Sequence, residues 1–276
     1  MRVVASVDIE GATGIVSKKE TREGGIDYNL GKRYLTRDVN AAIEGALEAG
    51  ATQVVCHDSH GLDCRNIQLE DLNPAAEVVR GTPILFFEDL QPEYDACFIV
   101  AAHSSYSEER GVLNHLFSSQ HFKDVKLNGQ PICEAEHTAA LAGYRGIPTV
   151  LITGDDVACS EMKKYIPEIE TVIVKYAISR YAARCLPFSK TGPMIREAAK
   201  RALIKVKEGA VKPYTYEGKQ DLEIRLYEPY RAKLIADLTG ARMPTKDTVA
   251  YTARDAMEVY RLLRLVLYLS FSTILS

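Results

Sequence analysis

The sequence has no tryptophan, no closely spaced cysteine pair and no long apolar run. Its six cysteines are scattered without a Cys-x-x-Cys motif, which argues against a cysteine-based zinc or redox site and favours buried, reduced thiols. The most apolar tract, 265–275, is too short to span a bilayer, and the first residues lead into a strand pattern rather than a signal peptide. We therefore expect a cytoplasmic protein.

An excess of charge of one sign is also lacking. The 34 basic and 37 acidic residues give a formal net charge of −3, which offers no electrostatic basis for binding nucleic acid or an anionic membrane. The composition, 46% hydrophobic and 26% charged, is that of an ordinary globular protein, and 276 residues suffice for one large or two modest domains. We expect neither a nucleic-acid partner nor a membrane partner.

The sequence does contain an alternation of strand and helix patterns in its first two thirds. Buried strands are predicted at 3–7, 53–56, 96–101, 149–153 and 171–174, and helices at 36–49, 132–144 and 160–165. This alternation predicts an α/β fold with a Rossmann-like, mainly parallel sheet and helices on both faces. The dipeptide Asn128-Gly129 predicts a hairpin turn.

The pattern changes near residue 191. A basic helix is followed there by an alternating strand at 222–226, a short helix, a further strand and a final helix capped by Asp255. We therefore predict two domains. Residues 1–190 form the α/β metal-binding catalytic domain, and residues 191–276 form a smaller α+β domain that serves in oligomerisation and in shaping the site.

Residues of the kinds that bind metals follow three of the predicted strands. Asp8 and Glu10 follow the first strand, Asp58 and His60 the second, and His103 the third. Because the carboxyl ends of parallel strands meet at one edge of a sheet, we expect these side chains to converge. Histidines and carboxylates are ligands for Zn²⁺, Mn²⁺ or Fe, and such a site makes hydroxide available near neutral pH. Taken alone, an aspartate after a strand is more often a helix cap, and a histidine there is more often a core or surface residue than a metal ligand. The prediction of a metal site therefore depends on finding such residues after three strands.

Several longer motifs extend this pattern along most of the chain: SVDIEGATG, HDSHG, AAH, GVLNH, NGQPICE, TGDD and VKYAISR. Together they resemble the M55 metallopeptidases, a family of DppA-like D-aminopeptidases. The resemblance implies a two-domain subunit that binds two zinc ions, with Mn²⁺ or Co²⁺ as possible substitutes. It also implies a ring-shaped homo-oligomer, a homodecamer, with active sites that face an inner chamber.

The resemblance assigns roles to particular residues. It implies that Asp8 bridges the two metals and that His115 is the reactive residue. The metal ligands that it implies are Asp8, Glu10, His60, His103 and Glu134.

His115 has three possible roles in such a site. A covalent nucleophile would form an acyl-imidazole, which is an uncommon choice for a peptidase. With two metals available to make hydroxide, we favour a general acid that protonates the leaving amine, or a donor to the tetrahedral oxyanion.

Five further polar residues have simpler interpretations. We expect Asp58 to orient His60 or cap a turn, and Asp155 and Asp156 to cap the following helix rather than bind the ammonium group of a substrate. We expect Glu136 and His137 to be solvated or to lie behind the ligands.

Together with these residues, the resemblance implies a dinuclear zinc-dependent aminopeptidase. It would hydrolyse the N-terminal residue, a D-amino acid resembling D-alanine, from short peptides by means of metal-activated water. One alternative is a metal-dependent amidase or phosphoesterase, although no basic cluster for phosphate accompanies the motifs. The other is a non-catalytic accessory protein that binds peptide or metal. Selection between D and L residues depends on pocket shape, which the sequence leaves open.

Overall fold

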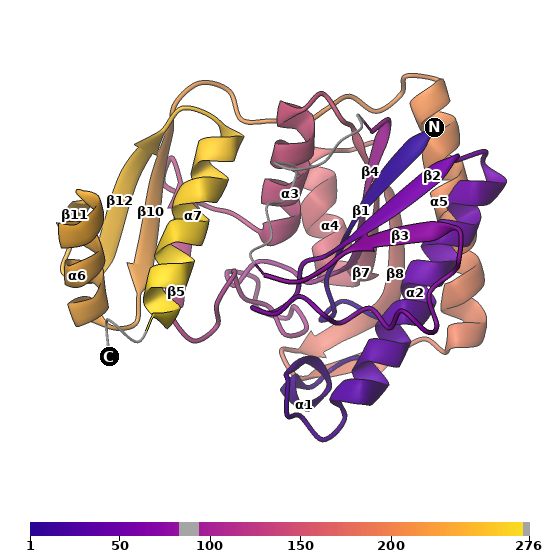
Figure 1. Ribbon diagram of the computed structural model, residues 1–276, viewed down its shortest axis with the longest axis horizontal. Coiled ribbons are helices and arrows are strands. Elements are labelled where there is room, and N and C mark those ends of the chain that lie inside the picture. The colour runs from indigo at the N-terminus through magenta and orange to yellow at the C-terminus, as the bar shows by residue number, and fades with distance from the viewer. Residues whose placement is uncertain (83–93, 273–276) are drawn as a thin grey trace.

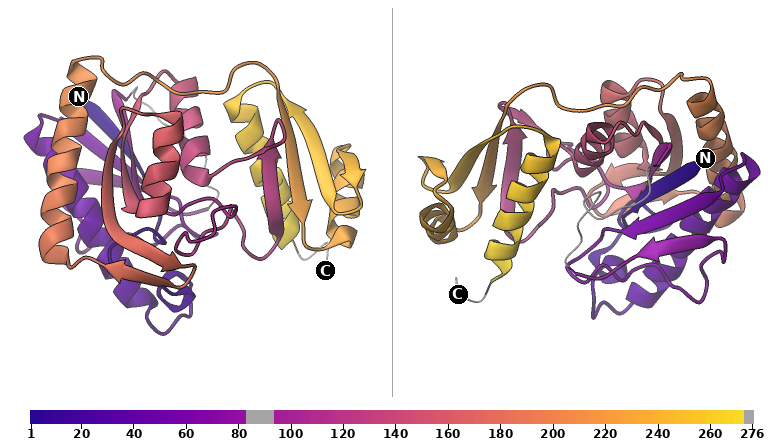
Figure 2. Two further views of the ribbon diagram at one scale, coloured as in Figure 1. Left: turned by 180° about the vertical axis from the view of Figure 1, so that it is seen from behind. Right: turned by 45° about the horizontal axis from the view of Figure 1, so that its top comes forward.

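The structure is a computed structural model that describes residues 1–82 and 94–272. Figure 1 shows two units side by side: an α/β unit that contains the N-terminus, and a smaller unit built on a second sheet. The predicted α/β architecture is confirmed. Figure 2 shows from behind that one connection runs over the top of the molecule between the two units.

The larger sheet has seven strands in the order β3-β2-β1-β4-β7-β8-β9, and all neighbours are parallel except β8 and β9. Its strands are β1 (Arg2–Val7), β2 (Gln53–Asp58), β3 (Ala76–Val79), β4 (Ala96–Ala102), β7 (Thr149–Asp155), β8 (Glu170–Ser179) and β9 (Ala182–Cys185). Strands β4 and β7 are buried along their whole length, which explains their continuous apolar sequences.

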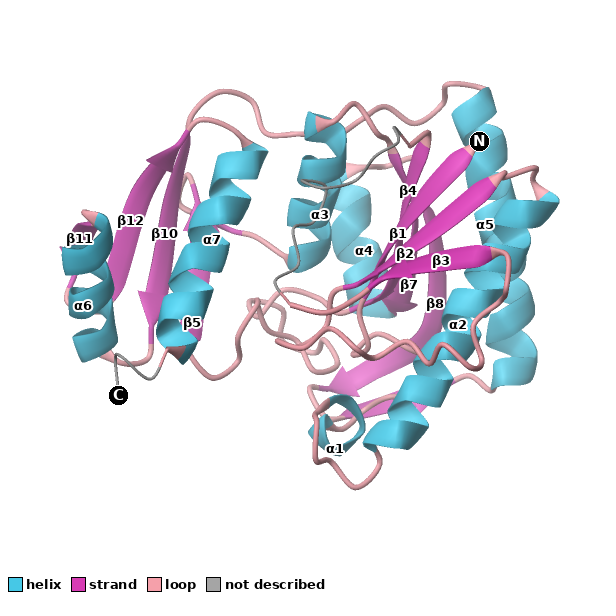
Figure 3. Cartoon of the chain, viewed as in Figure 1, coloured by secondary structure: helices cyan, strands magenta, loops and turns pink. Residues whose placement is uncertain are grey.

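Helices cover both faces of this sheet (Figure 3). Helices α2 (Tyr28–Glu48) and α5 (Phe188–Lys207) lie on one face, and α3 (Glu134–Tyr144) and α4 (Asp156–Tyr165) lie on the other.

The polar segment 17–33, whose composition favours a loop, contains the short helix α1 (Lys18–Thr21) and the first turns of α2. A capping box between Ser17 and Glu20 begins α1. The hydroxyl of buried Tyr28 donates to Asn66, which anchors the start of α2.

The smaller unit contains a five-stranded antiparallel sheet in the order β11-β12-β10-β5-β6. Its elements are β5 (Phe122–Leu127), β6 (Gln130–Pro131), β10 (Gln220–Leu226), α6 (Pro229–Thr239), β11 (Arg242–Thr245), β12 (Thr248–Ala253) and α7 (Ala256–Phe271). The predicted hairpin is present between β5 and β6, where Asn128 and Gly129 both have positive φ angles.

The two units do not divide at a single point of the chain. Residue 190, near which a boundary was expected, lies in α5, and α5 packs against α2, β7 and β8 of the larger unit. Strand β5, although early in the sequence, pairs with β10 of the smaller unit. The chain therefore crosses between the units before β5, after β6 and after α5.

No helix within residues 1–82 and 94–272 is long and apolar enough to cross a membrane. Most of the apolar tract near the C-terminus lies in α7, whose Val259, Leu263 and Val266 are buried against the second sheet. Residues 273–275 of that tract lie outside the described residues.

The sheet places the ends of β2, β1 and β4 next to one another, because β1 lies between the other two. The loop that follows β1 then runs across the end of β4. The amide of Asp8 donates to Val100 O (3.0 Å), and the amide of Gly11 donates to Ala101 O (2.8 Å). A Cβ atom on Gly11 would lie 2.0 Å from the carbonyl oxygen of Ala102, so this close approach requires glycine.

The close contact at Gly11 predicts a large effect of adding one methyl group. Gly11→Ala should lower the free energy of unfolding by about 3 kcal/mol, because the backbone of β4 must move. Gly192→Ala is the matched control: like Gly11 this glycine does not have a positive φ, but no atom lies within 4 Å of its added Cβ. Because Gly192 lies inside α5, alanine should raise the free energy of unfolding there by about 0.5–1 kcal/mol. Urea denaturation followed by circular dichroism measures both. Equal losses would contradict the packing described here.

Candidate metal centre

The first cluster of ligand-type atoms consists of Asp8, Glu10 and His60, all within 4.8 Å of one another. His60 Nδ1 lies 3.1 Å from Asp8 Oδ1 and 2.8 Å from Glu10 Oε2. The other ring nitrogen, Nε2, donates to the carbonyl of Thr21 (2.7 Å). This hydrogen bond assigns the hydrogen of the neutral ring to Nε2, so Nδ1 presents its lone pair to the carboxylates.

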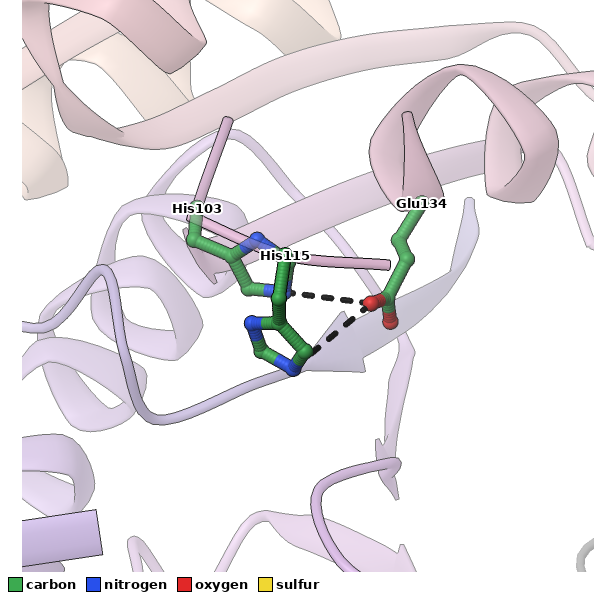
Figure 4. A group of neighbouring side chains, drawn as sticks. All are labelled: His103, His115 and Glu134. Carbon is green, nitrogen blue, oxygen red and sulfur yellow. Dashed lines mark ion pairs between the residues drawn. The ribbon is translucent and has the colours of Figure 1, made fainter. Parts of the chain in front are cut away.

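The second cluster consists of His103, His115 and Glu134, which Figure 4 shows facing one another. Glu134 Oε1 lies 3.2 Å from His103 Nε2 and 3.9 Å from His115 Nε2. His103 Nδ1 donates to the carbonyl of Ser104 (3.0 Å), so its Nε2 presents the lone pair. The backbone amide of Phe117 donates to Glu134 Oε1 (2.6 Å) and holds that carboxylate at the first turn of α3.

Asp8 joins the two clusters. Its Oδ1 lies 3.1 Å from His60 Nδ1, and its Oδ2 lies 3.4 Å from His103 Nε2. One carboxylate thus offers an oxygen to each side, which is the arrangement by which a carboxylate bridges two metal ions.

The atoms that face the centre are almost all acceptors when the imidazoles are neutral. Glu10 and His103 are 5% and 3% exposed, so water does little to separate these acceptors. Glu10 Oε2 is buried and accepts no hydrogen bond of normal geometry within the described residues. Acceptors gathered in a buried place require a cation or extra protons between them. The nitrogen and carboxylate donors present here are those that zinc prefers.

In the protein without metal, the carboxylates raise the pKa values of two histidines, which again indicates that positive charge is stabilised at this site. Burial opposes a charge on His103, but Glu134 and Asp8 outweigh burial and raise its pKa to about 10. Burial likewise opposes a charge on His60, yet Glu10 and Asp8 raise its pKa well above the usual value. His115 differs, because burial and the neighbouring charge of His103 lower its pKa. His115 is therefore the imidazole that stays neutral beside two that do not.

Two carboxylates at the ends of β2 and β7 do not join these clusters. Asp58 accepts from the backbone amide of Ile67 (2.7 Å) and from the side chain of Asn66 (2.7 Å), so it caps a turn as expected. Asp155 Oδ1 accepts from the amide of Ala158 (2.8 Å) and caps α4, which confirms the cap interpretation.

Of the two alternatives expected for Glu136 and His137, solvation is wrong, since each is 2% exposed. The connection between α5 and β10 covers them. Tyr214 donates its hydroxyl to Glu136 (2.8 Å), and the hydroxyl of Tyr216 lies 3.2 Å from His137 Nδ1. No motif or periodicity in the sequence marks these tyrosines.

A cavity of about 360 Å³ opens beside both clusters. Lys18 and Arg22, from α1 and the residue after it, line the cavity together with Leu267 and Phe271 of α7. Sequence reasoning missed all four. Lys18 and Arg22 lie in a polar, glycine-rich segment whose sequence favours a loop. Leu267 and Phe271 lie in an apolar tract whose sequence favours a helix buried in the core.

The site is a buried set of imidazoles and carboxylates at the carboxyl edge of a parallel sheet, and it opens to a cavity. These are the features of a metal-dependent hydrolase. The family model described as Peptidase_M55, D-aminopeptidase, matches residues 1–265, and the chain belongs to this family.

Two relatives agree with this assignment. The chain is 30% identical over 278 residues to a D-aminopeptidase of Bacillus subtilis (strain 168), with 99% of each chain covered. Among solved structures it is similar to the Zn-dependent D-aminopeptidase DppA from Bacillus subtilis, described as a self-compartmentalizing protease. The TM-score is 0.90 at 29% identity, and 99% of each chain is covered.

The raised pKa of His103 predicts an unusual pH dependence for the metal-free protein. A group whose pKa rises on folding stabilises the fold below its unfolded pKa, and this stabilisation is lost as the pH rises through the folded pKa. The metal-free protein should therefore lose stability between pH 6.5 and about 10. Added zinc displaces these protons, so zinc should stabilise the protein most at the alkaline end.

Urea denaturation across this pH range, with chelator or with zinc, measures the effect. His103→Gln is the control: it removes one of the two titrating rings, so the loss of stability with rising pH should become smaller, and the part due to the raised pKa of His60 should remain. A metal-free wild type whose stability rises with pH would contradict the assignment of these protons.

Proposed function

We propose that this protein is a dinuclear zinc-dependent aminopeptidase that removes the N-terminal residue, a D-amino acid resembling D-alanine, from short peptides. The observation that carries the proposal is the position of Asp8 between two histidines, one oxygen toward each. A single cation would not need both clusters, whereas two cations would be bridged by this carboxylate.

The proposed ligands fall into two sets, one for each metal ion. Glu10 and His60 would hold one ion, His103 and Glu134 would hold the other, and Asp8 would contact both. When bound, the zinc ions supply Lewis acidity and a water that ionises near neutral pH. The carbonyls of Thr21 and Ser104 support this function, since each keeps the liganding nitrogen of its histidine free of hydrogen.

We propose that His115 moves the proton of the reaction. His115 Nδ1 donates to the carbonyl of Leu113 (2.9 Å), so in the neutral ring Nε2 lacks a hydrogen and faces Glu134 and the cavity. Such a ring cannot donate to an oxyanion until it has taken up a proton. His115 therefore accepts the proton of the attacking water at Nε2 and returns it to the leaving amine.

The cavity supports a substrate of a few residues. Its volume of about 360 Å³ is at the lower end of ligand pockets. Leu113 and Phe117 offer apolar contacts near His115, and Lys18 and Arg22 offer positive charge. A short peptide has the matching groups: a small side chain at its cleaved end and a carboxylate at its other end.

We further propose the assembly and the setting of the enzyme. Of the predicted domain 191–276, the part after α5 would serve in oligomerisation and site shaping, and Leu267 and Phe271 in the cavity wall support the second role. The self-compartmentalizing character of the related DppA supports a ring-shaped homo-oligomer. We propose in addition that the ring is a homodecamer and that the enzyme is cytoplasmic. Mn²⁺ or Co²⁺ would substitute for zinc, because both accept nitrogen and carboxylate ligands. Light scattering of the purified protein measures the subunit number.

The proposed activity predicts zinc-dependent cleavage with selection between enantiomers. D-alanyl p-nitroanilide should be hydrolysed at least about tenfold faster than the L-enantiomer, and a chelator should abolish hydrolysis. Zinc, manganese or cobalt should restore it. A protein that binds zinc stoichiometrically but cleaves neither enantiomer would support a binding role, and cleavage of p-nitrophenyl phosphate alone would support a phosphoesterase.

A second prediction separates proton transfer from metal binding at His115, since this ring also lies in a potential ligand cluster. His115→Ala should lower kcat by roughly 10²- to 10⁴-fold while the zinc content stays at the wild-type value. His103→Ala is the matched variant on the stacked ring, whose centroid lies 4.1 Å away, and it should lose one zinc. Loss of zinc from His115→Ala would assign that residue to the metal instead.

A further inference from the structure

Lys175 of the VKYAISR motif has no role in the site described above. It lies on β8 and is completely buried, with an exposed fraction of 0%. Its ammonium group donates to three backbone carbonyls, those of Glu10 (2.6 Å), Ala12 (3.0 Å) and Ile15 (2.7 Å). An ammonium group has three hydrogens, and one is available for each acceptor.

All three acceptors belong to the loop that carries Asp8 and Glu10. In the sheet, β8 is separated from β1 by β4 and β7, so the loop must extend across the ends of two strands to reach it. Its beginning is held by the hydrogen bonds of Asp8 and Gly11 to β4. Lys175 holds its far end, and the bond to the carbonyl of Glu10 acts on a ligand residue directly.

A second buried charge holds the same loop from another direction. Asp38 of α2 is 0% exposed and accepts from both the amide (2.7 Å) and the hydroxyl (2.9 Å) of Thr13. Burial lowers the pKa of Lys175, while Asp155 and Asp38 are among the groups that raise it, and the result is about 8. The loop is thus held between a buried cation and a buried anion.

We propose that Lys175 is a positioning residue of the metal centre, which holds the loop so that Asp8 and Glu10 face the histidines. This inference rests on the proposed dinuclear function. His103 and Glu134 project from β4 and α3, which Lys175 does not contact through these hydrogen bonds. Loss of Lys175 should therefore weaken the Glu10–His60 side of the centre more than the His103–Glu134 side.

The test is a zinc titration of Lys175→Met against a chromophoric chelator, at a temperature at which circular dichroism shows each variant folded. Methionine keeps much of the length of lysine but has no donors. One of the two zinc ions should bind roughly 10- to 100-fold more weakly than in wild type, and the affinity of the other, which shares only Asp8 with this loop, should fall much less.

Val174→Ala is the matched control for lost stability alone. Val174 is the preceding residue of β8, is 0% exposed and lies in the hydrophobic core. Its truncation should lower the melting temperature while both zinc affinities stay at wild-type values. If Lys175→Met does not fold, Lys175→Gln, which keeps one amide donor group, should show the same unequal loss in milder form.

The outcomes are distinguishable. A wild type that binds fewer than two zinc ions overturns the proposed dinuclear function itself. A wild type with two zinc ions and a Lys175 variant with unchanged affinities overturns the positioning role. Equal weakening of both sites, or the same weakening in Val174→Ala, shows that Lys175 only stabilises the fold and also overturns it.

Discussion

The carboxylate of Asp8, shared between His60 and His103, is the interaction on which the rest of the site depends. These three residues follow three adjacent strands, and they meet only because β1 lies between β2 and β4. Asp8 reaches both histidines because the backbone turns sharply after β1, with its amide bonded to β4. Polar groups gathered in this way are unfavourable without positive charge, so the local structure requires either metal ions or protons on these histidines.

The surrounding structure holds this unfavourable arrangement in place. Ala101, Leu113 and Phe117 all have positive φ angles, although none is glycine, and each lies within two residues of His103 or His115. Such conformations cost about 1–2 kcal/mol each and persist only where neighbouring contacts compensate. The hydrogen bond from Ala101 N to Thr153 Oγ1 (2.8 Å) is one such contact. Favourable contacts elsewhere in the sheet thus compensate for these strained backbone conformations, which place His103 and His115 at the centre.

The parts that could be predicted from the sequence depend on short-range patterns. Apolar runs followed by Asp8, His60 and His103 located the strand ends, and parallel pairing then required those ends to share an edge. Asn128-Gly129 located a hairpin, because this dipeptide by itself favours the positive φ angles of a two-residue hairpin turn.

The parts that could not be predicted depend on contacts between distant segments. Strand β5 joins β10, about a hundred residues later, and nothing local in its sequence indicates that partner. The carbonyls of Thr21 and Ser104 orient the histidines, but every residue has a carbonyl, so no side-chain pattern marks them. Nothing local in the sequence indicates the role of Lys175, because its three acceptors lie some 160 residues earlier.

The central claim is that Asp8 lies between two metal ions. Anomalous diffraction from zinc-soaked crystals, collected on both sides of the zinc absorption edge, tests it most directly. The account predicts two anomalous peaks per subunit, one on each side of the Asp8 carboxylate, within ligand distance of His60 and of His103 respectively. A single peak, or two peaks of which one does not contact Asp8, would contradict it.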